Sequence, residues 1–157
     1  MKYIFYDFDG VMTNNKVIID EKGNEMVEVN RSDGLGVAEI KKLGIEQIIL
    51  STETNSVVSS RAVKLGIKCM QGIENKKETL TKYCTKNNIQ LDNVAFVGND
   101  INDKDVMKIV KRSFCPADAH SEIKKIASKV LITKGGDGVI RELLDILKKG
   151  KKDDQFF

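Results

Sequence analysis

The stretch "KYIFYDFDGVMT", residues 2–13, joins a short apolar run to two acids and a glycine. The run is rich in the aromatic and β-branched residues that favour a buried strand. Side chains two residues apart on a strand point the same way, so Asp7 and Asp9 are expected to lie together where this strand ends. Two carboxylates so close repel each other and raise one pKa. The pair therefore predicts a divalent cation between them, or a reaction in which one acid is ionised while the other carries a proton.

Beyond this stretch, short apolar runs alternate with segments of helical period. The other expected strands are 45–50, 67–70, 93–98, 113–115 and 129–133. The expected helices are 34–43, 55–65, 76–87, 102–111, 119–127 and 137–149, several of which end at a glycine. Strand–helix–strand repeats of this kind predict an α/β fold, a doubly wound, Rossmann-like parallel sheet with helices on both faces.

One segment breaks the alternation. Residues 16–30 read as two short strands around a turn at Lys22 and Gly23, which predicts a small β-hairpin inserted after the first strand. The length of 157 residues fits one domain. We expect that domain to span 1–150, followed by a polar C-terminal tail, 151–157.

Composition excludes several classes of protein. The net charge of +3 is small and dispersed along the chain, which argues against a nucleic-acid partner. The N-terminal apolar run is interrupted by acids and predicts neither a signal peptide nor a membrane span. Three cysteines without CxxC spacing are expected to be reduced, buried thiols. The sequence thus predicts a cytoplasmic protein.

Polar residues follow the strands on one side of the predicted sheet, where α/β proteins bind their ligands. Asp7 and Asp9 follow the first strand, and the second ends in residues 51–53, "STE". The third leads to Lys76, and the fourth to "GNDIND", residues 98–103. Carboxylates, a hydroxyl and an ammonium at one edge suit phosphoryl transfer through an aspartyl phosphate, with a cation to offset the negative charge.

The ordered motifs "DFDGVMT", "LST", "QGIENK", "VGNDIND" and "ADAH" resemble those of the haloacid dehalogenase-like phosphatases. The resemblance covers about residues 3–149 and is to the capless branch, which contains 3-deoxy-octulosonate 8-phosphate and nonulosonate 9-phosphate phosphatases. The chain is also similar to the C-terminal domain of some acylneuraminate cytidylyltransferases. It resembles the capless branch in having the hairpin and no cap domain.

The resemblance implies a role for each motif residue. Asp7 would be the nucleophile, and Asp9 would protonate the leaving sugar oxygen and then deprotonate the attacking water. The phosphoryl group would be held by Ser51, Lys76 and the backbone at Gly10. Mg²⁺ would be bound by Asp7, the Asp9 carbonyl oxygen and the fourth-strand cluster, with Asn99 and Asp100 as the expected ligands there and Asp103 as an alternative.

The chain departs from many relatives at Asn99, where they have an acid. An amide oxygen can ligate Mg²⁺ without offsetting its charge, so weaker metal binding is expected. The only histidine, His120, is expected to lie in the first turn of a helix rather than in a catalytic triad. The glycines of "GGDG", residues 135–138, match no Walker pattern and are expected to form a tight turn into the last helix.

The resemblance further implies a substrate and an assembly. The expected substrate is a nonulosonate 9-phosphate, of the sialic-acid type, contacted by Thr52, Glu53 and Lys64. The alternatives are 3-deoxy-D-manno-octulosonate 8-phosphate and, in a different class, a weakly active oligomerisation module. In capless relatives a neighbouring subunit covers the site, which implies a homotetramer joined through the hairpins.

Overall fold

The computed structural model describes residues 1–152 and has a six-stranded parallel sheet at its centre. The strands lie in the order β5–β4–β1–β6–β7–β8. Their bounds are β1 Tyr3–Tyr6, β4 Glu46–Leu50, β5 Lys68–Met70, β6 Val94–Val97, β7 Arg112–Cys115 and β8 Lys129–Val130. Every neighbouring pair is parallel, so the predicted doubly wound α/β fold is confirmed.

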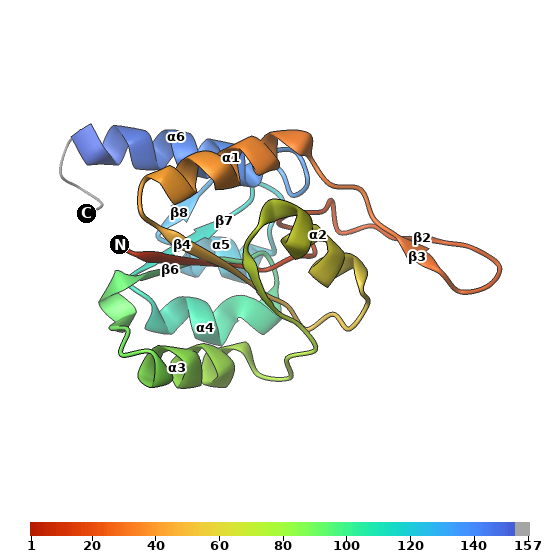
Figure 1. Cartoon of the computed structure of the whole chain (residues 1–157), viewed down its shortest axis with the longest axis horizontal. Helices are drawn as coiled ribbons and strands as arrows, with labels where there is room; N and C mark the ends of the chain where they lie inside the picture. The colour runs from red at the N-terminus through yellow and green to blue at the C-terminus, as the bar shows by residue number, and fades with distance from the viewer. Residues whose placement is uncertain (153–157) are drawn as a thin grey trace.

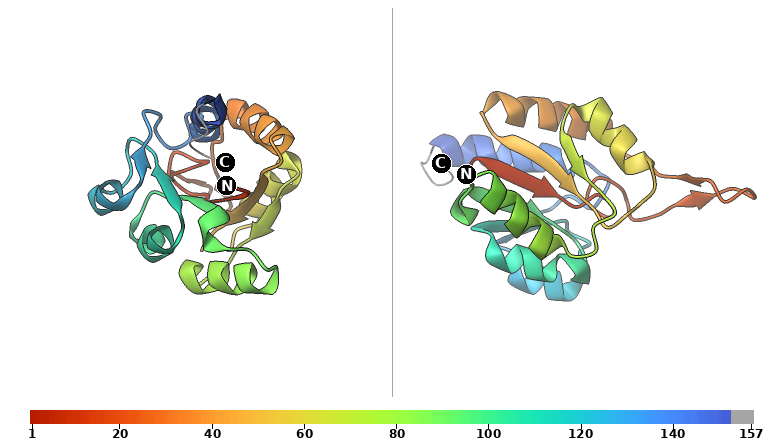
Figure 2. Two further views of the ribbon diagram at one scale, coloured as in Figure 1. Left: turned by 90° about the vertical axis from the view of Figure 1, so that its left-hand side faces the viewer. Right: turned by 60° about the horizontal axis from the view of Figure 1, so that its bottom comes forward.

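Helices cover both faces of the sheet (Figures 1 and 2). They are α1 Arg31–Lys42, α2 Val57–Leu65, α3 Lys76–Lys86, α4 Lys104–Ile109, α5 Ser121–Ile126 and α6 Val139–Lys152, with two 3₁₀ turns, η1 Leu91–Asn93 and η2 Ile101–Asp103. The core on one face contains apolar residues of α1, α2 and α6, and the core on the other face those of α3, α4 and α5. No helix within residues 1–152 is long and apolar enough to cross a membrane.

The strand β1 lies in the middle of the sheet and positions the acids that follow it. It pairs with β4 through Tyr3–Glu46 and with β6 through Tyr3–Val94, each pairing continuing in register to Tyr6. The last three residues of β1 are fully buried, because a central parallel strand is covered on both faces. The backbone of Asp7 continues this pairing, its N–H donating to the Val97 carbonyl (2.8 Å).

The predicted hairpin is present, with strands of two residues each, β2 Ile18–Ile19 and β3 Glu25–Met26. Its turn is closed by Asp20, whose Oδ1 accepts from the N–H groups of Lys22 and Asn24, and Gly23 adopts the positive φ (+80°) that the turn requires. The hairpin projects away from the sheet on the side opposite the two termini (Figures 1 and 2).

Several element boundaries differ from those expected. The strand predicted over 129–133 ends at Val130, and just beyond it Glu142 accepts from the N–H groups of Ile132 and Thr133. The last helix starts at Val139 and continues through Gly150, the expected end, to Lys152. The rest of the predicted tail, residues 153–157, lies outside the described part of the chain.

The helices α1 and α6 lie side by side on one face of the sheet (Figure 1). Gly36 permits their close approach, because a Cβ there would lie 3.0 Å from the backbone of Ile140. Asp33, buried in α1, accepts at Oδ1 from the N–H of Ile140 (2.9 Å), and its Oδ2 has no hydrogen-bond partner among the described residues. Burial raises the pKa of Asp33 to about 6.

Replacing Asp33 with asparagine is expected to stabilise the protein by about 1–2 kcal/mol at pH 7.5. The amide keeps an oxygen for α6 and removes a buried, half-partnered charge. An acid whose folded pKa is raised destabilises the fold above that pKa, and this penalty is lost as the pH falls through 6 toward 3.8. Urea unfolding of D33N and wild type should therefore differ at pH 7.5 and converge near pH 4. Equal stability at pH 7.5 would contradict the prediction.

Candidate active site

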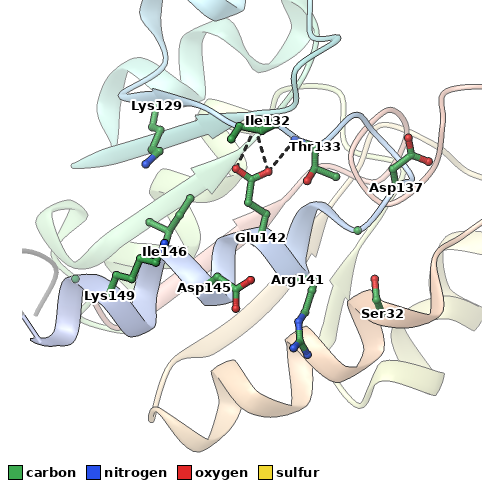
Figure 3. A pocket seen from close by; sticks show the side chains of 12 residues that line it. Ser32, Lys129, Ile132, Thr133, Asp137, Arg141, Glu142, Asp145, Ile146 and Lys149 are labelled. Atoms are coloured by element: carbon green, nitrogen blue, oxygen red, sulfur yellow. Dashed lines mark hydrogen bonds between the residues drawn. The ribbon is translucent and has the colours of Figure 1, made fainter.

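The predicted site residues meet in a cavity of about 260 Å³ at the carboxyl end of the sheet. It is lined by Asp7, Asp9, Asn15, Thr52, Asn99, Asp100 and Asn102. A larger cavity of about 660 Å³ lies between α6 and the end of β8 (Figure 3). There the Glu142 carboxylate is occupied by backbone N–H groups, whereas acids from separate strands converge in the smaller cavity. The smaller cavity is therefore the candidate active site.

Lys76 joins two of the strand-end acids. It begins α3 and is 2% exposed, and its Nζ lies 2.7 Å from Oδ1 of Asp7 and 2.7 Å from Oδ1 of Asp103. Asn75 caps this helix by accepting from the N–H of Glu78, which fixes where the lysine emerges. Lys76 is thus a buried cation between two carboxylates and not a solvated lysine at a helix start.

Charge and burial shift the pKa values of this cluster. Burial, and then the charge of Asp103, raise the pKa of Asp7 to about 7, against the opposing effect of Lys76. Burial lowers the pKa of Lys76, but the two carboxylates outweigh it, so the net direction is upward and the ammonium stays protonated. Burial and the charge of Glu53 also raise the pKa of Asp9. The site therefore carries more negative than positive charge when its acids are ionised.

A tight turn after Asp9 holds its side chain. The N–H groups of residues 11–13 all converge on the Phe8 carbonyl. The buried Thr13 hydroxyl lies 3.4 Å from Oδ1 of Asp9, to which it donates, and accepts from the N–H of Gly10 (3.2 Å). Gly10 has a φ of +76°, and a Cβ there would lie 2.0 Å from the Asn99 amide. The glycine in "DFDG" is therefore required both by its backbone conformation and by its contact with Asn99.

The Asn99 side chain fits the geometry of a metal ligand. Its terminal atom on the acid side lies 3.2 Å from Oδ2 of Asp7 and 2.8 Å from the Asp9 carbonyl oxygen. If this terminal atom is the amide nitrogen, it donates to both oxygens. If it is the amide oxygen, three oxygens face one another. Adjacent ligands of octahedral Mg²⁺ at 2.0–2.1 Å are about 3 Å apart, which matches this spacing.

Acidic side chains alone do not form the candidate metal site. Within residues 1–152, no group of three His, Cys, Asp or Glu side chains is arranged to hold a metal. A metal here would draw on the Asn99 amide oxygen and the Asp9 carbonyl oxygen beside the Asp7 carboxylate, which are ligand types that Mg²⁺ accepts.

The structure separates the roles of Asp100 and Asp103. Asp103 is fully buried, and its Oδ2 accepts from the N–H groups of Asn99 (2.8 Å) and Asp100 (3.3 Å), while its Oδ1 pairs with Lys76. This use of both oxygens makes Asp103 a support for the loop and for Lys76. Asp100 is exposed, lines the cavity, and accepts at Oδ1 from the N–H of Ile101 (2.7 Å).

The residues expected to bind substrate are only partly brought together. Thr52 lines the cavity. Glu53 lies close enough to raise the pKa of Asp9, but its Oε1 accepts from the N–H groups of Thr54 and Asn55. Lys64 is exposed on α2 and lines a separate groove of about 350 Å³ with Phe8 and the base of the hairpin. Within one chain, Lys64 is not part of the cavity that contains Asp7 and Asp9.

Two further predicted positions have structural contacts. Ser51 is buried after β4 and does not cap α2, whose N-cap is Ser56. The Ser51 Oγ accepts from the N–H of Glu53 (3.1 Å). His120 is the N-cap of α5, where its Nδ1 accepts from the N–H of Glu122 (3.2 Å).

Sequence reasoning missed three polar residues of the site. Thr13 bonds to Asp9, and Asn15 and Asn102 line the cavity. Thr13 stood in the quoted motif, and its position four residues after Asp9, across a glycine turn, was the available signal. Nothing in the sequence alone distinguishes Asn15 or Asn102 from surface asparagines.

Comparisons with known proteins identify the family of the chain. A family model of haloacid dehalogenase-like hydrolases matches residues 14–143. The chain is similar to 3-deoxy-D-manno-octulosonate 8-phosphate phosphatase KdsC of Escherichia coli K12, at 32% identity over 157 residues, covering 98% of this chain and 84% of that protein. The corresponding Haemophilus influenzae protein is 28% identical, covering 100% and 88%.

Solved structures give the same picture. The 3-deoxy-D-manno-octulosonate 8-phosphate phosphatase of Moraxella catarrhalis, in complex with magnesium, phosphate and KDO, has a TM-score of 0.92 at 25% identity, covering 98% of this chain and 88% of that one. A Streptomyces avermitilis protein assigned provisionally to the HAD family hydrolases has a TM-score of 0.89 at 41% identity, covering 91% and 82%.

Proposed function

The chain belongs to the haloacid dehalogenase-like hydrolases, in the branch of the capless octulosonate 8-phosphate phosphatases, and from that membership we propose a Mg²⁺-dependent hydrolysis of 2-keto-3-deoxy sugar-acid phosphates. The best-supported substrate is 3-deoxy-D-manno-octulosonate 8-phosphate, the substrate named for the relatives that align over nearly the whole chain. This favours the alternative considered above over the nonulosonate 9-phosphate.

The observation that carries the proposal is that Asp7, Lys76 and Asn99, which follow three different strands, meet at one point. In the first half-reaction, the Asp7 carboxylate, held by Lys76, attacks phosphorus, and the bond to the sugar oxygen breaks as Asp9 gives that oxygen its proton. The raised pKa of Asp9 suits this acid role.

In the second half-reaction, Asp9 takes a proton from water, whose oxygen attacks the phosphorus and releases inorganic phosphate and the Asp7 carboxylate. Ser51, Lys76 and the backbone at Gly10 are proposed to hold the phosphoryl oxygens. Mg²⁺ would be held by Asp7, the Asp9 carbonyl, Asn99 and Asp100, and it would supply charge neutralisation there. A cation there also favours the ionised form of Asp7.

Phosphate release from octulosonate 8-phosphate, nonulosonate 9-phosphates and glucose 6-phosphate, each with Mg²⁺ or with EDTA, tests the function. The expected result is Mg²⁺-dependent turnover with the highest kcat/KM on the octulosonate. Turnover on neither sugar acid would refute the proposal.

A second candidate substrate is the nonulosonate 9-phosphate, favoured by the position of Glu53. Its charge acts on Asp9, so Glu53 lies near that acid although it does not line the cavity, and a longer sugar is proposed to extend toward it. Lys64 would then come from a neighbouring subunit, because it lies outside the cavity of its own chain. A wild-type preference for the nonulosonate that falls in Glu53→Ala and Lys64→Ala would select this substrate. The weakly active module is less well supported, since a scaffold has no need of a lysine buried between two acids.

The proposed tetramer rests on the hairpin, which exposes apolar side chains. Ile18 is 65% exposed and Ile19 is 61% exposed. Two exposed isoleucines on one short hairpin favour a surface that another subunit covers. We expect the double change Ile18→Asp and Ile19→Asp to produce smaller species in light scattering and to lower kcat/KM on the sugar acid. Ile132→Asp, at an exposed isoleucine outside the hairpin, is the control. An unchanged mass in the hairpin variant would contradict the assembly.

Replacing Asn99 with aspartate is expected to tighten Mg²⁺ binding by about tenfold, because a charged ligand replaces a neutral one. Titration calorimetry measures this without turnover. Asn102→Asp adds the same negative charge at the cavity wall, so it controls for the general effect of charge on Mg²⁺ binding. Equal Mg²⁺ affinities in the two variants would show that Asn99 is not a ligand.

A further inference from the structure

We propose that Asp118 is a positioning residue for the reaction: it holds the loop of residues 134–138, here termed the glycine strap, against the catalytic loop, residues 10–14. The inference rests on the proposed function for the role of the catalytic loop. The strap joins β8 to α6 and contains the "GGDG" run that the active-site chemistry leaves unexplained.

The strap lies directly on the backbone of the catalytic loop. The N–H of Gly136 donates to the carbonyl of Val11 (3.1 Å). A Cβ on Gly135 would lie 2.2 Å from the Gly10 carbonyl oxygen, and one on Gly136 would lie 2.6 Å from the backbone nitrogen of Asn14. Backbone is therefore packed on backbone, an approach that only glycines permit.

Three carboxylates from outside the strap hold it and its flanks. Glu142 accepts from the N–H groups of Ile132 (3.0 Å) and Thr133 (2.8 Å) just before it (Figure 3). Asp33 accepts from the N–H of Ile140 just after it. Asp118, from the loop after β7, accepts at Oδ1 from the N–H of Gly135 itself (2.9 Å). Of the three, Asp118 is the one that bonds to the strap itself.

The catalytic loop in turn orients the groups that react. Its Thr13 hydroxyl donates to Asp9, and the turn places Gly10 at the proposed phosphoryl site. A shift of a few tenths of an ångström at Gly10 would misplace both the acid and the backbone donor, and catalysis is sensitive to such shifts. The strap is thus a rigid support behind the loop.

Asp118 offers a clean test because its side chain is exposed, so its removal takes no apolar contact from the core. Asp118→Ala removes the acceptor, and Asp118→Asn keeps an oxygen in its place. Asp137→Ala makes the same chemical change inside the strap, at an exposed side chain that forms no hydrogen bond or ion pair within residues 1–152. The last two variants are the matched controls.

The first measurement is hydrogen–deuterium exchange of residues 8–15, which does not depend on turnover. We expect faster exchange there in Asp118→Ala only, with α3 unchanged in all variants. The second is steady-state kinetics, in which Asp118→Ala should lower kcat about tenfold and weaken inhibition by orthovanadate by a similar factor, with KM little changed. Asp118→Asn should restore both.

The outcomes separate the two proposals. Unchanged exchange in Asp118→Ala overturns the strap whatever the activity does, and faster exchange with unchanged kcat overturns its positioning role. Equal losses in Asp118→Ala and Asp137→Ala also overturn it. Wild-type protein without Mg²⁺-dependent phosphatase activity refutes the proposed function instead, and the exchange measurement still decides whether Asp118 holds the loop.

Discussion

Replacing Asp7 with asparagine abolishes phosphate release, with a loss on the order of 10³-fold or more, while the protein stays folded. The amide nearly preserves the volume of the carboxylate but cannot attack phosphorus. Above pH 7 the variant should be at least as stable as wild type, because Lys76 keeps its contact with Asp103 and the variant lacks an acid whose pKa burial raises to about 7. Inorganic phosphate release and thermal unfolding measure the two effects.

The control for this variant is Asp105→Asn, the same change at an exposed position of α4. It should match wild type in both measurements. If D7N retains turnover within tenfold of wild type in folded protein, the aspartyl-phosphate mechanism is wrong.

Replacing Lys76 with methionine destabilises the protein by about 3 kcal/mol or more and also removes most of the activity. Two carboxylates, Asp7 and Asp103, would then be buried without a partner cation, and breaking a buried ion pair from one side typically costs 3–5 kcal/mol. The activity falls because the same ammonium holds the nucleophile and is proposed to hold the phosphoryl oxygens.

This destabilisation depends on pH with a definite sign. The pKa of Asp7 is already raised to about 7 in the folded wild type, and loss of Lys76 raises it further. An acid whose pKa is raised in the folded protein lowers folding stability above that pKa, and it no longer does so once it is protonated. The loss of stability in Lys76→Met should therefore be largest at pH 8 and smaller at pH 5.5. Urea unfolding in EDTA measures it. Lys77→Met, the next and exposed lysine, is the control, and equal stability of the two variants at pH 8 would contradict the role of Lys76.

The sheet and the order of its elements followed from the sequence because their signals are local. Apolar runs of strand length, helical periods and capping residues each act over a few positions. The same holds for Asp7 and Asp9, whose spacing alone places them on one side of a strand. The end of β8 could not be predicted, since the backbone just beyond it bonds across a loop to Glu142.

The contacts within the site were harder to predict, because they join residues distant in the chain. Lys76 was expected to contact phosphate, but its bridge to Asp103 depends on how α3 packs beside η2. Asp103 was considered only as an alternative metal ligand, and its complete burial beneath the loop is a result of tertiary packing. The glycine strap was interpreted as a turn, since nothing in its own residues indicates which backbone it touches.

The central position of β1 also has a consequence for the synthesis of the protein. Among the strands of this sheet, β1 is synthesised first, and it needs partners on both sides, which come from residues 46–49 and 94–97. Until residue 97 has emerged, one edge of β1 has no strand to bond, and an unpaired apolar strand edge is prone to pair with other chains. A nascent chain stalled before β6 is therefore expected to require a chaperone, whereas one stalled after it already contains every strand beside the two acids.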